Sequence, residues 1–227
     1  MKRKRMILWA AVIGAAVGAR VVRGGFHGSK NAFLAPDKLL LAHRPMLLVA
    51  AGAFILMGIY WEIAAKNASE ASRSESKVSR SFHVFLVNAA IMLEIVPVHG
   101  LGRFVPVSLW IMSAGLALEL FGLILAIWAR RHLGRNWSGE ITIKVEHELV
   151  RSGPYRRLRH PIYTGFLAMY AGILLVTGEW LAVVGFIMVG LAYWRKIRLE
   201  EANLNVAFGA GYDAYRRESW ALVPGIL

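Results

Sequence analysis

Long apolar segments constrain this chain more than any other feature of its sequence. A helix needs about 20 mostly apolar residues to cross the hydrocarbon core of a bilayer. Segments of about this character cover residues 6–22, 45–65, 82–98, 105–129, 161–177 and 180–195. Helices and closed barrels are the structures that satisfy a backbone inside lipid. We therefore expect an all-α, polytopic membrane protein with about six transmembrane helices.

The composition supports this expectation. Hydrophobic residues make up 57% of the chain, against about 45–50% in a typical soluble domain. The net charge is +13, and the cations lie between the apolar segments, where they orient helices and contact lipid headgroups. The lipid bilayer is the expected partner; nucleic acid is not. The chain has no cysteine, which excludes disulfides and thiolate metal sites.

The distribution of cations predicts the orientation in the membrane. A basic start precedes the first apolar segment. A cleaved signal peptide shares these features, but we expect a retained helix because every later segment also has the character of a membrane span. The N-terminus is then cytosolic, and six spans place the C-terminus and residues 130–160 on the same side. The connection at residues 23–44 is an exception, because its four cations would lie outside.

The last two apolar segments are separated only by Gly178 and Glu179, so they are expected to form a tight C-terminal helical hairpin. The polar residues 130–160 include an alternating run, EITIKVEHELV, which is typical of extended backbone. No partner strand is expected, and the run is interpreted as a cap on the cytosolic face. The Ser-rich stretch 66–80 is interpreted as an exposed loop.

The stretch LVRSGPYRRLRHPIYTG, residues 149–165, is the first candidate site. Pro161 suits the first position of a helix, which places His160 at the helix start. Unpaired N–H groups there favour anions, and three nearby arginines add positive charge. The stretch is therefore a candidate site for a carboxylate or phosphate. From spacing alone, a purely topological role with lipid headgroups is the simpler interpretation of these residues.

A pair of acidic residues near the end of the chain is the second candidate. Glu200 and Glu201 follow a basic cluster, and the short hairpin returns them to the membrane side of His160. Acidic and basic groups together suit a zwitterionic ligand. Spacing alone equally allows an ordinary surface pair between Lys196 and Glu200, which are four residues apart on a helix.

Other ionisable residues give weaker signals. Glu94 and Glu119 lie within apolar spans, where carboxylates are functional candidates. His132, His147 and His160 match no zinc-binding spacing, so no metal site is expected.

The two candidate regions together carry a recognisable pattern. HELVRSGPYRRLRHPIYTG, followed by RKIRLEEANLNVAFGAGYDAYRRESWALVPG, resembles the isoprenylcysteine carboxyl methyltransferase family of integral membrane enzymes. The resemblance extends from about Trp128 to the C-terminus. It implies two parts: variable transmembrane helices, about four of them, in residues 1–130, and a methyltransferase core with the cap, the hairpin and a C-terminal helix in residues 131–227.

The resemblance also implies roles for individual residues. S-adenosylmethionine, which leaves as S-adenosylhomocysteine, would contact Glu140, His147, Glu148, Leu149, Val150, Tyr155, His160, Pro161, Ile162, Tyr163 and Glu200. The substrate would contact Lys196, with Arg195 and Glu201. Lys196 stands where eukaryotic members have arginine, and Glu140 where they have glutamine. No catalytic base is assigned, because a carboxylate with a pKa of about 3.5 is already ionised at neutral pH.

The expected function is methyl transfer to the carboxylate of a lipophilic, isoprenylcysteine-like substrate at the cytosolic membrane face, without an obligate protein partner. Three alternatives remain at this stage. They are N-methylation of a phospholipid or other lipid amine, a fold-related membrane reductase that acts on sterol-like substrates, and a non-enzymatic scaffold or transporter.

Overall fold

The computed structural model describes residues 36–65, 73–74, 76–95, 102–137, 142–143 and 149–226. The first apolar segment, residues 6–22, lies outside these ranges. Three expected cofactor contacts, Glu140, His147 and Glu148, also lie outside them.

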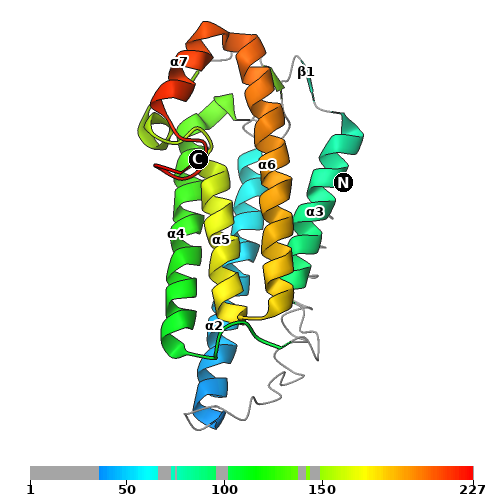
Figure 1. The fold of residues 1–227 in the computed structure, drawn as a ribbon, viewed down its shortest axis with the longest axis vertical. Coiled ribbons are helices and arrows are strands. Elements are labelled where there is room, and N and C mark those ends of the chain that lie inside the picture. The colour runs from blue at the N-terminus through cyan, green and yellow to red at the C-terminus, as the bar shows by residue number, and fades with distance from the viewer. Residues whose placement is uncertain are drawn as a thin grey trace.

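The described chain is a bundle of long helices. Figure 1 shows α2 to α6 running side by side along the long axis, with α7 folded back at one end. The helices are α2 (Pro36–Ala64), α3 (Lys77–Ile95), α4 (Leu109–Leu133), α5 (Pro161–Thr177), α6 (Trp180–Phe208) and α7 (Ala210–Glu218), with short 3-10 turns η2 (Gly134–Asn136) and η3 (Gly153–Arg156).

Four of these helices are long and apolar enough to cross a membrane. They are α3, α4, α6 and, within α2, Pro45–Ala64; α5 is a shorter apolar helix of 17 residues. Large apolar side chains such as Trp110, Ile124 and Leu191 are more than 60% exposed on the bundle surface. Helices that are apolar on their outer faces as well as inside are typical of membrane spans. The all-α, polytopic membrane fold is thus confirmed.

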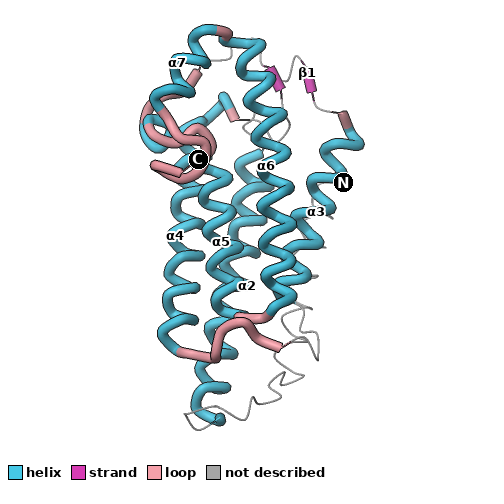
Figure 2. Tube along the Cα trace, in the orientation of Figure 1, coloured by secondary structure: helices cyan, strands magenta, loops and turns pink. Residues whose placement is uncertain are grey.

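One expectation about the cap was wrong. The alternating run does have a partner: β2 (Thr142–Ile143) pairs antiparallel with β1 (Arg73–Ser74). Figure 2 shows both short strands in magenta at the α7 end of the bundle. The pairing was hidden in the sequence because β1 lies in the Ser-rich stretch 66–80, which has no strand-like alternation.

Glycines bring α4 and α5 into backbone contact. Gly115 and Gly122 on α4 face Gly172 and Gly165 on α5. The seven-residue spacing on each helix is close to two turns, so both glycines lie on one face. A Cβ atom added to Gly165 would lie 2.6 Å from the Gly122 carbonyl oxygen. Small residues allow this close approach, as they do in other membrane helix pairs.

The tight hairpin is confirmed. Thr177 ends α5, Gly178 adopts a left-handed conformation with φ of 63°, and α6 begins at Trp180. The Phe104 N–H donates to the Gly178 carbonyl oxygen at 3.0 Å, so the segment before α4 packs against the turn. Helices α5 and α6 are therefore antiparallel neighbours, and the start of α5 lies beside the later part of α6 at the opposite end of the bundle.

Helix α6 is longer than its apolar part. The apolar segment ends near Arg195, and the helix continues beyond it as a polar helix to Phe208, with 29 residues in all. Gly209, with φ of 49°, then separates it from α7. Because of this extension, Glu200 and Glu201 project from a continuous helix.

Candidate active site

His160 is the centre of a polar cluster where α5 begins. It is the residue before Pro161, the first residue of α5, as expected. Its side chain is only 4% exposed and lies between two carboxylates of α6. Nδ1 is 3.7 Å from Glu200 Oε2, and Nε2 is 3.4 Å from Glu201 Oε1. The start of α5 and the extension of α6 are thus joined through one imidazole.

The two glutamates differ in their surroundings. Glu200 is 35% exposed, and one of its oxygens accepts a hydrogen bond from the Tyr163 hydroxyl at 2.8 Å. Glu201 is 13% exposed and forms an ion pair with Arg159, whose Nε lies 2.7 Å from Oε1. The Nε atom of Arg216 lies 3.9 Å from the other oxygen of Glu201, Oε2. Glu200 is therefore the more accessible carboxylate, whereas Glu201 is held within a network of cations.

Tyr155 provides a buried hydroxyl near this cluster. Its side chain packs with Ala129, Trp137 and Ile162, and Val150 lies against the same group. Burial raises the pKa of Tyr155 well above its usual range, and the nearby negative charge of Glu200 adds to this effect. Among the described residues, no hydrogen-bond partner reaches Tyr155 Oη. An unsatisfied buried hydroxyl beside an accessible carboxylate suits a polar ligand.

The turn that carries Tyr155 depends on Gly153. Gly153 has φ of 56°, and a Cβ atom there would lie 2.6 Å from the His132 ring. His132 Nε2 is 2.8 Å from Ser152 Oγ, which holds the end of α4 against the turn. Glycine is thus required both by the backbone conformation and by the close approach of the ring.

The C-terminal tail closes over the basic segment. The backbone N–H groups of Arg159 and His160 donate to the carbonyl oxygens of Trp220 and Ala221, at 2.8 and 3.0 Å. The Thr164 hydroxyl donates to the Leu222 carbonyl oxygen at 2.7 Å. No periodicity in the sequence pointed to this pairing. The tail therefore fixes the backbone from which His160 projects.

Helix α7 also contacts the turn that carries Tyr155. The Tyr215 hydroxyl donates to the Tyr155 carbonyl oxygen at 2.6 Å. Burial raises the pKa of Tyr215 to about 12, although the nearby charges of Arg159 and Arg151 act to lower it. The hydroxyl therefore remains a hydrogen-bond donor at neutral pH.

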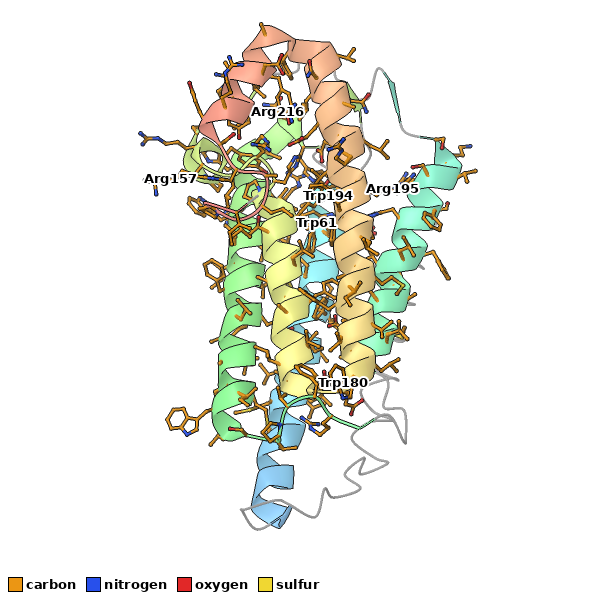
Figure 3. All side chains as sticks on the ribbon, in the orientation of Figure 1. Trp61, Arg157, Trp180, Trp194, Arg195 and Arg216 are labelled. Atoms are coloured by element: carbon orange, nitrogen blue, oxygen red, sulfur yellow. The ribbon has the colours of Figure 1, made fainter. Side chains whose placement is uncertain are left out.

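The three arginines before His160 do not act together. Arg156 and Arg157 are exposed, and Figure 3 shows Arg157 projecting away from the protein. Arg159 instead turns inward to Glu201 and to the carbonyl oxygens of Arg216 and Ser219. Sequence reasoning overestimated the positive charge directed at the site and did not anticipate the role of Arg159 as a clamp.

Two of the three expected substrate contacts, Lys196 and Arg195, lie about one turn before the glutamates on α6. Lys196 is half-buried on α6, four residues before Glu200. Arg195 donates to Ser79 Oγ of α3 at 2.6 Å, and Figure 3 shows it on the side of α6 that faces α3. Of the expected cofactor contacts, Leu149 is half-buried and Pro161 is buried.

The intramembrane carboxylates are not part of this cluster. Glu94 and Glu119 are fully buried. They pack against Gly185 and Gly172, near the hairpin turn. Gly172 lies twelve residues after His160 on α5, which is about 18 Å along a helix. A shared site with His160 is excluded by this separation.

Comparison with known proteins places the chain in a family. The model of the isoprenylcysteine carboxyl methyltransferase (ICMT) family matches residues 115–206. Protein-S-isoprenylcysteine O-methyltransferase B of Arabidopsis thaliana is 30% identical over 170 residues, which cover 71% of this chain and 83% of that protein. Protein-S-isoprenylcysteine O-methyltransferase A of the same plant is 33% identical over 118 residues, covering 51% of this chain and 60% of the relative.

A solved structure gives an independent view of the fold. The eukaryotic intramembrane Ras methyltransferase ICMT aligns with a TM-score of 0.52 at 18% identity, over 86% of this chain and 70% of that one. At this identity the likeness concerns the fold alone. The first of the plant relatives matches 71% of this chain at 30% identity, and together the matches lead to one conclusion: this chain belongs to the isoprenylcysteine carboxyl methyltransferase family.

Proposed function

We propose that the protein transfers a methyl group from S-adenosylmethionine to the carboxylate of an isoprenylcysteine-like lipophilic substrate, at the cytosolic face of a membrane. The observation that carries this proposal is the cluster of His160, Glu200 and Tyr163. It places the accessible carboxylate of Glu200 beside the N-terminus of α5, at one end of an apolar helix bundle. Membership in a methyltransferase family supports the reaction class.

The residues present fit the proposed methyl donor. Glu200 can accept hydrogen bonds from an ammonium or from ribose hydroxyls, and the start of α5 favours a carboxylate. The unpartnered Tyr155 hydroxyl offers a further polar contact, and Val150 and Ile162 provide an apolar surface beside it. Leu149, Pro161 and the residues Glu140, His147 and Glu148 would complete the same site from the cap.

The chain's own residues would act by positioning. S-adenosylmethionine supplies an electrophilic methyl group when bound. The acceptor carboxylate is ionised at neutral pH, so no residue needs to remove a proton from it. His160 holds Glu200 and Glu201 in place, and Lys196 attracts the acceptor as a point charge. Alignment of the two reactants is the main requirement of an in-line transfer.

Glu201 is better suited to holding the His160 ring in place than to contacting the substrate. Its carboxylate is already paired with Arg159 and lies 3.4 Å from the His160 ring. We therefore assign it a positioning role for His160 and leave substrate contact to Lys196 and Arg195. The cytosolic location of the site follows from the basic residues around the cap. An acceptor with a lipid tail would reach this site from the membrane.

The purified protein in detergent can test this function directly. Calorimetric titration with S-adenosylhomocysteine should show binding, whereas NADPH should not bind; the reverse result would indicate a reductase. Incubation with labelled methyl donor and N-acetyl-S-farnesylcysteine should give a product that releases labelled methanol in alkali. A methylated lipid product that resists alkali would instead indicate an amine acceptor and would refute the proposal.

A further inference from the structure

Exposed tryptophans mark both ends of the membrane-spanning surface. Trp110 and Trp128, towards the two ends of α4, are 86% and 53% exposed, and Trp180 at the hairpin turn is 54% exposed. Trp110 and Trp128 are eighteen residues apart, which is about 27 Å along a helix and close to the thickness of the hydrocarbon core of a bilayer. Tryptophan is enriched where lipid meets water. Trp128 therefore marks the headgroup level at the end of the bundle that carries the candidate active site.

The contacts between α4 and α5 place the C-terminal tail at the same level. Gly122 of α4 lies opposite Gly165 of α5, and the two helices are antiparallel. Six residues further along α4, Trp128 is thus level with the segment just before α5. The Trp220 N–H donates to the Arg157 carbonyl oxygen in this segment at 2.9 Å. The start of the tail is therefore held at the level of the lipid headgroups.

At this level the protein exposes cations beside apolar side chains. Arg156, Arg157 and Arg217, the last near the end of α7, are exposed, and Figure 3 shows Arg157 projecting outward. Among the described side chains, no carboxylate forms a salt bridge with any of the three. The tail exposes Trp220 at 39% and Ile226 at 76%. These five residues are called the tail surface below. Arginines beside exposed apolar groups are typical of surfaces that lie on anionic membranes.

The tail surface is joined to the candidate active site through the backbone. The Trp220 carbonyl oxygen accepts from the Arg159 N–H at 2.8 Å, and that of Ala221 accepts from the His160 N–H at 3.0 Å. The tail thus holds the backbone from which His160 reaches Glu200. A contact that fixes the tail against the membrane would also fix this backbone.

We propose that the tail surface docks on anionic phospholipid headgroups, and that this contact strengthens ligand binding at the candidate active site. The effect on ligand binding rests on the proposed function, whereas the lipid contact does not. Charge complementarity selects an anionic lipid, because each arginine near such a membrane adds to the attraction. Although Glu218 is also exposed beside Arg217, the surface remains positively charged. Its neighbours α4 and α5 already lie in the bilayer, so the lipid is within reach.

A single fluorophore tests the lipid contact without any ligand. The chain has no cysteine, so Ile226→Cys can carry a dye in nanodiscs of mixed phosphatidylglycerol and phosphatidylcholine. A nitroxide on the phosphatidylglycerol should quench this dye about twice as strongly as the same density of nitroxide on the phosphatidylcholine. Arg156→Gln/Arg157→Gln should remove most of this preference. Equal quenching by the two lipids in the protein with both arginines would overturn the proposal.

The matched control removes the same amount of charge elsewhere. Lys77→Gln/Arg198→Gln replaces two exposed cations of α3 and α6 that lie outside the tail surface, and it should keep the preference for the anionic lipid. Loss of the preference in this control as well would show that the net charge of the protein, rather than the tail surface, attracts the lipid.

Ligand affinity tests the connection to the site. S-adenosylhomocysteine carries no net charge at neutral pH, so attraction of the ligand itself to the membrane does not contribute. Its Kd should be about fivefold lower in nanodiscs with about 30% phosphatidylglycerol than in phosphatidylcholine alone. The difference should disappear in Arg156→Gln/Arg157→Gln and in about 0.5 M salt, which screens exposed charges. In phosphatidylcholine alone, this variant should bind within about twofold of the unchanged protein, because its arginines then have no anionic lipid to contact.

The results that contradict each part are distinct. Equal Kd values in the two kinds of nanodisc would show that the lipid contact does not reach the site. If glycerol phosphate in solution lowered the Kd as phosphatidylglycerol does, a soluble phosphate rather than a lipid would be the partner. Absence of S-adenosylhomocysteine binding in both kinds of nanodisc would refute the proposed function, while the quenching measurement would still decide the lipid contact.

Discussion

At the residue scale, neighbouring side chains of the same type have different environments. Glu200 and Glu201 are adjacent in the sequence, but Glu200 is accessible and Glu201 is enclosed by Arg159 and His160. The first can exchange partners when a ligand arrives, whereas the second already has its partners. Their substitutions should therefore affect different properties of the protein.

Replacing each glutamate by glutamine separates ligand binding from stability. Glu200→Gln should weaken S-adenosylhomocysteine binding about tenfold or more, because a charge-assisted hydrogen bond is lost. Glu201→Gln should mainly lower the thermal midpoint, because Arg159 loses its ionic partner. Calorimetric titration and thermal denaturation in the same detergent measure the two effects. Equal affinities for both variants would contradict the assignment of Glu200 as a ligand contact.

Tyr155 gives a second test at this scale. Tyr155→Phe removes a buried hydroxyl that has no partner among the described residues. The free energy of unfolding of the ligand-free protein should be unchanged or raised by about 1 kcal/mol, while the affinity for S-adenosylhomocysteine falls. Tyr215→Phe is the control, because its hydroxyl donates to a carbonyl oxygen and its loss should destabilise by about 1 kcal/mol. A less stable Tyr155→Phe variant would show that this hydroxyl is satisfied without a ligand.

At the scale of elements, the α4–α5 pair depends on backbone contact. Gly122 and Gly165 face each other without side chains between them. This contact positions the start of α5, and with it His160, relative to the end of α4. Packing of these two helices therefore bears on the site as well as on stability.

A single added methyl group tests this dependence. Gly122→Ala should lower the thermal midpoint and reduce the free energy of unfolding by about 1–3 kcal/mol, because the new Cβ atom would overlap the backbone of α5. Gly190→Ala on α6 is the matched control, since no atom lies within 4 Å of its added Cβ. Thermal denaturation in detergent provides the comparison. Equal midpoints for the two variants would show that α4 can move away from α5 at no cost.

At the scale of the whole molecule, the two ends of the bundle have different roles. One end carries the hairpin turn at Gly178, and the other carries the cap, α7 and the C-terminal tail. Figure 3 shows Trp180 at the first end and Arg157 and Arg216 at the second. All contacts of His160 described above belong to the second end.

Truncation tests whether the tail supports the site. Removal of residues 219–227 should abolish S-adenosylhomocysteine binding while the helical content is retained, because the N–H groups of Arg159 and His160 lose their partners Trp220 and Ala221. Removal of residues 223–227 keeps those hydrogen bonds and should have little effect. Titration and circular dichroism measure the two properties. Normal binding after the longer truncation would show that the tail is dispensable.

The absence of cysteine allows a direct test of orientation. A cysteine introduced at Arg157 should react with a membrane-impermeant maleimide only from the cytosolic side, because the basic end of the bundle is proposed to face the cytosol. A cysteine at Pro106, which is exposed near the hairpin turn, should react only from the other side. Right-side-out and inverted vesicles distinguish the two. Labelling with the opposite sidedness would overturn the proposed topology.

Local patterns in the sequence determined the main elements of this protein. The apolar segments predicted the helices from α2 to α6 because membrane spans are recognised by length and composition alone. Gly178 predicted the hairpin turn, because glycine readily adopts the left-handed conformation that a tight turn needs. Pro161 predicted the start of α5, because its fixed φ and missing N–H suit the first position of a helix. The family pattern indicated residues of the site, whose roles remain predictions.

Only the tertiary structure decided which side chains meet. Successive residues on a helix point about 100° apart, so the sequence could not tell that Glu201 is enclosed while Glu200 is accessible. The partner of β2, the pairing of the tail with Arg159 and His160, and the burial of His83 against α6 likewise join distant segments. Such contacts depend on how each helix is rotated and packed against its neighbours, and that rotation is determined by the whole bundle rather than by any one segment.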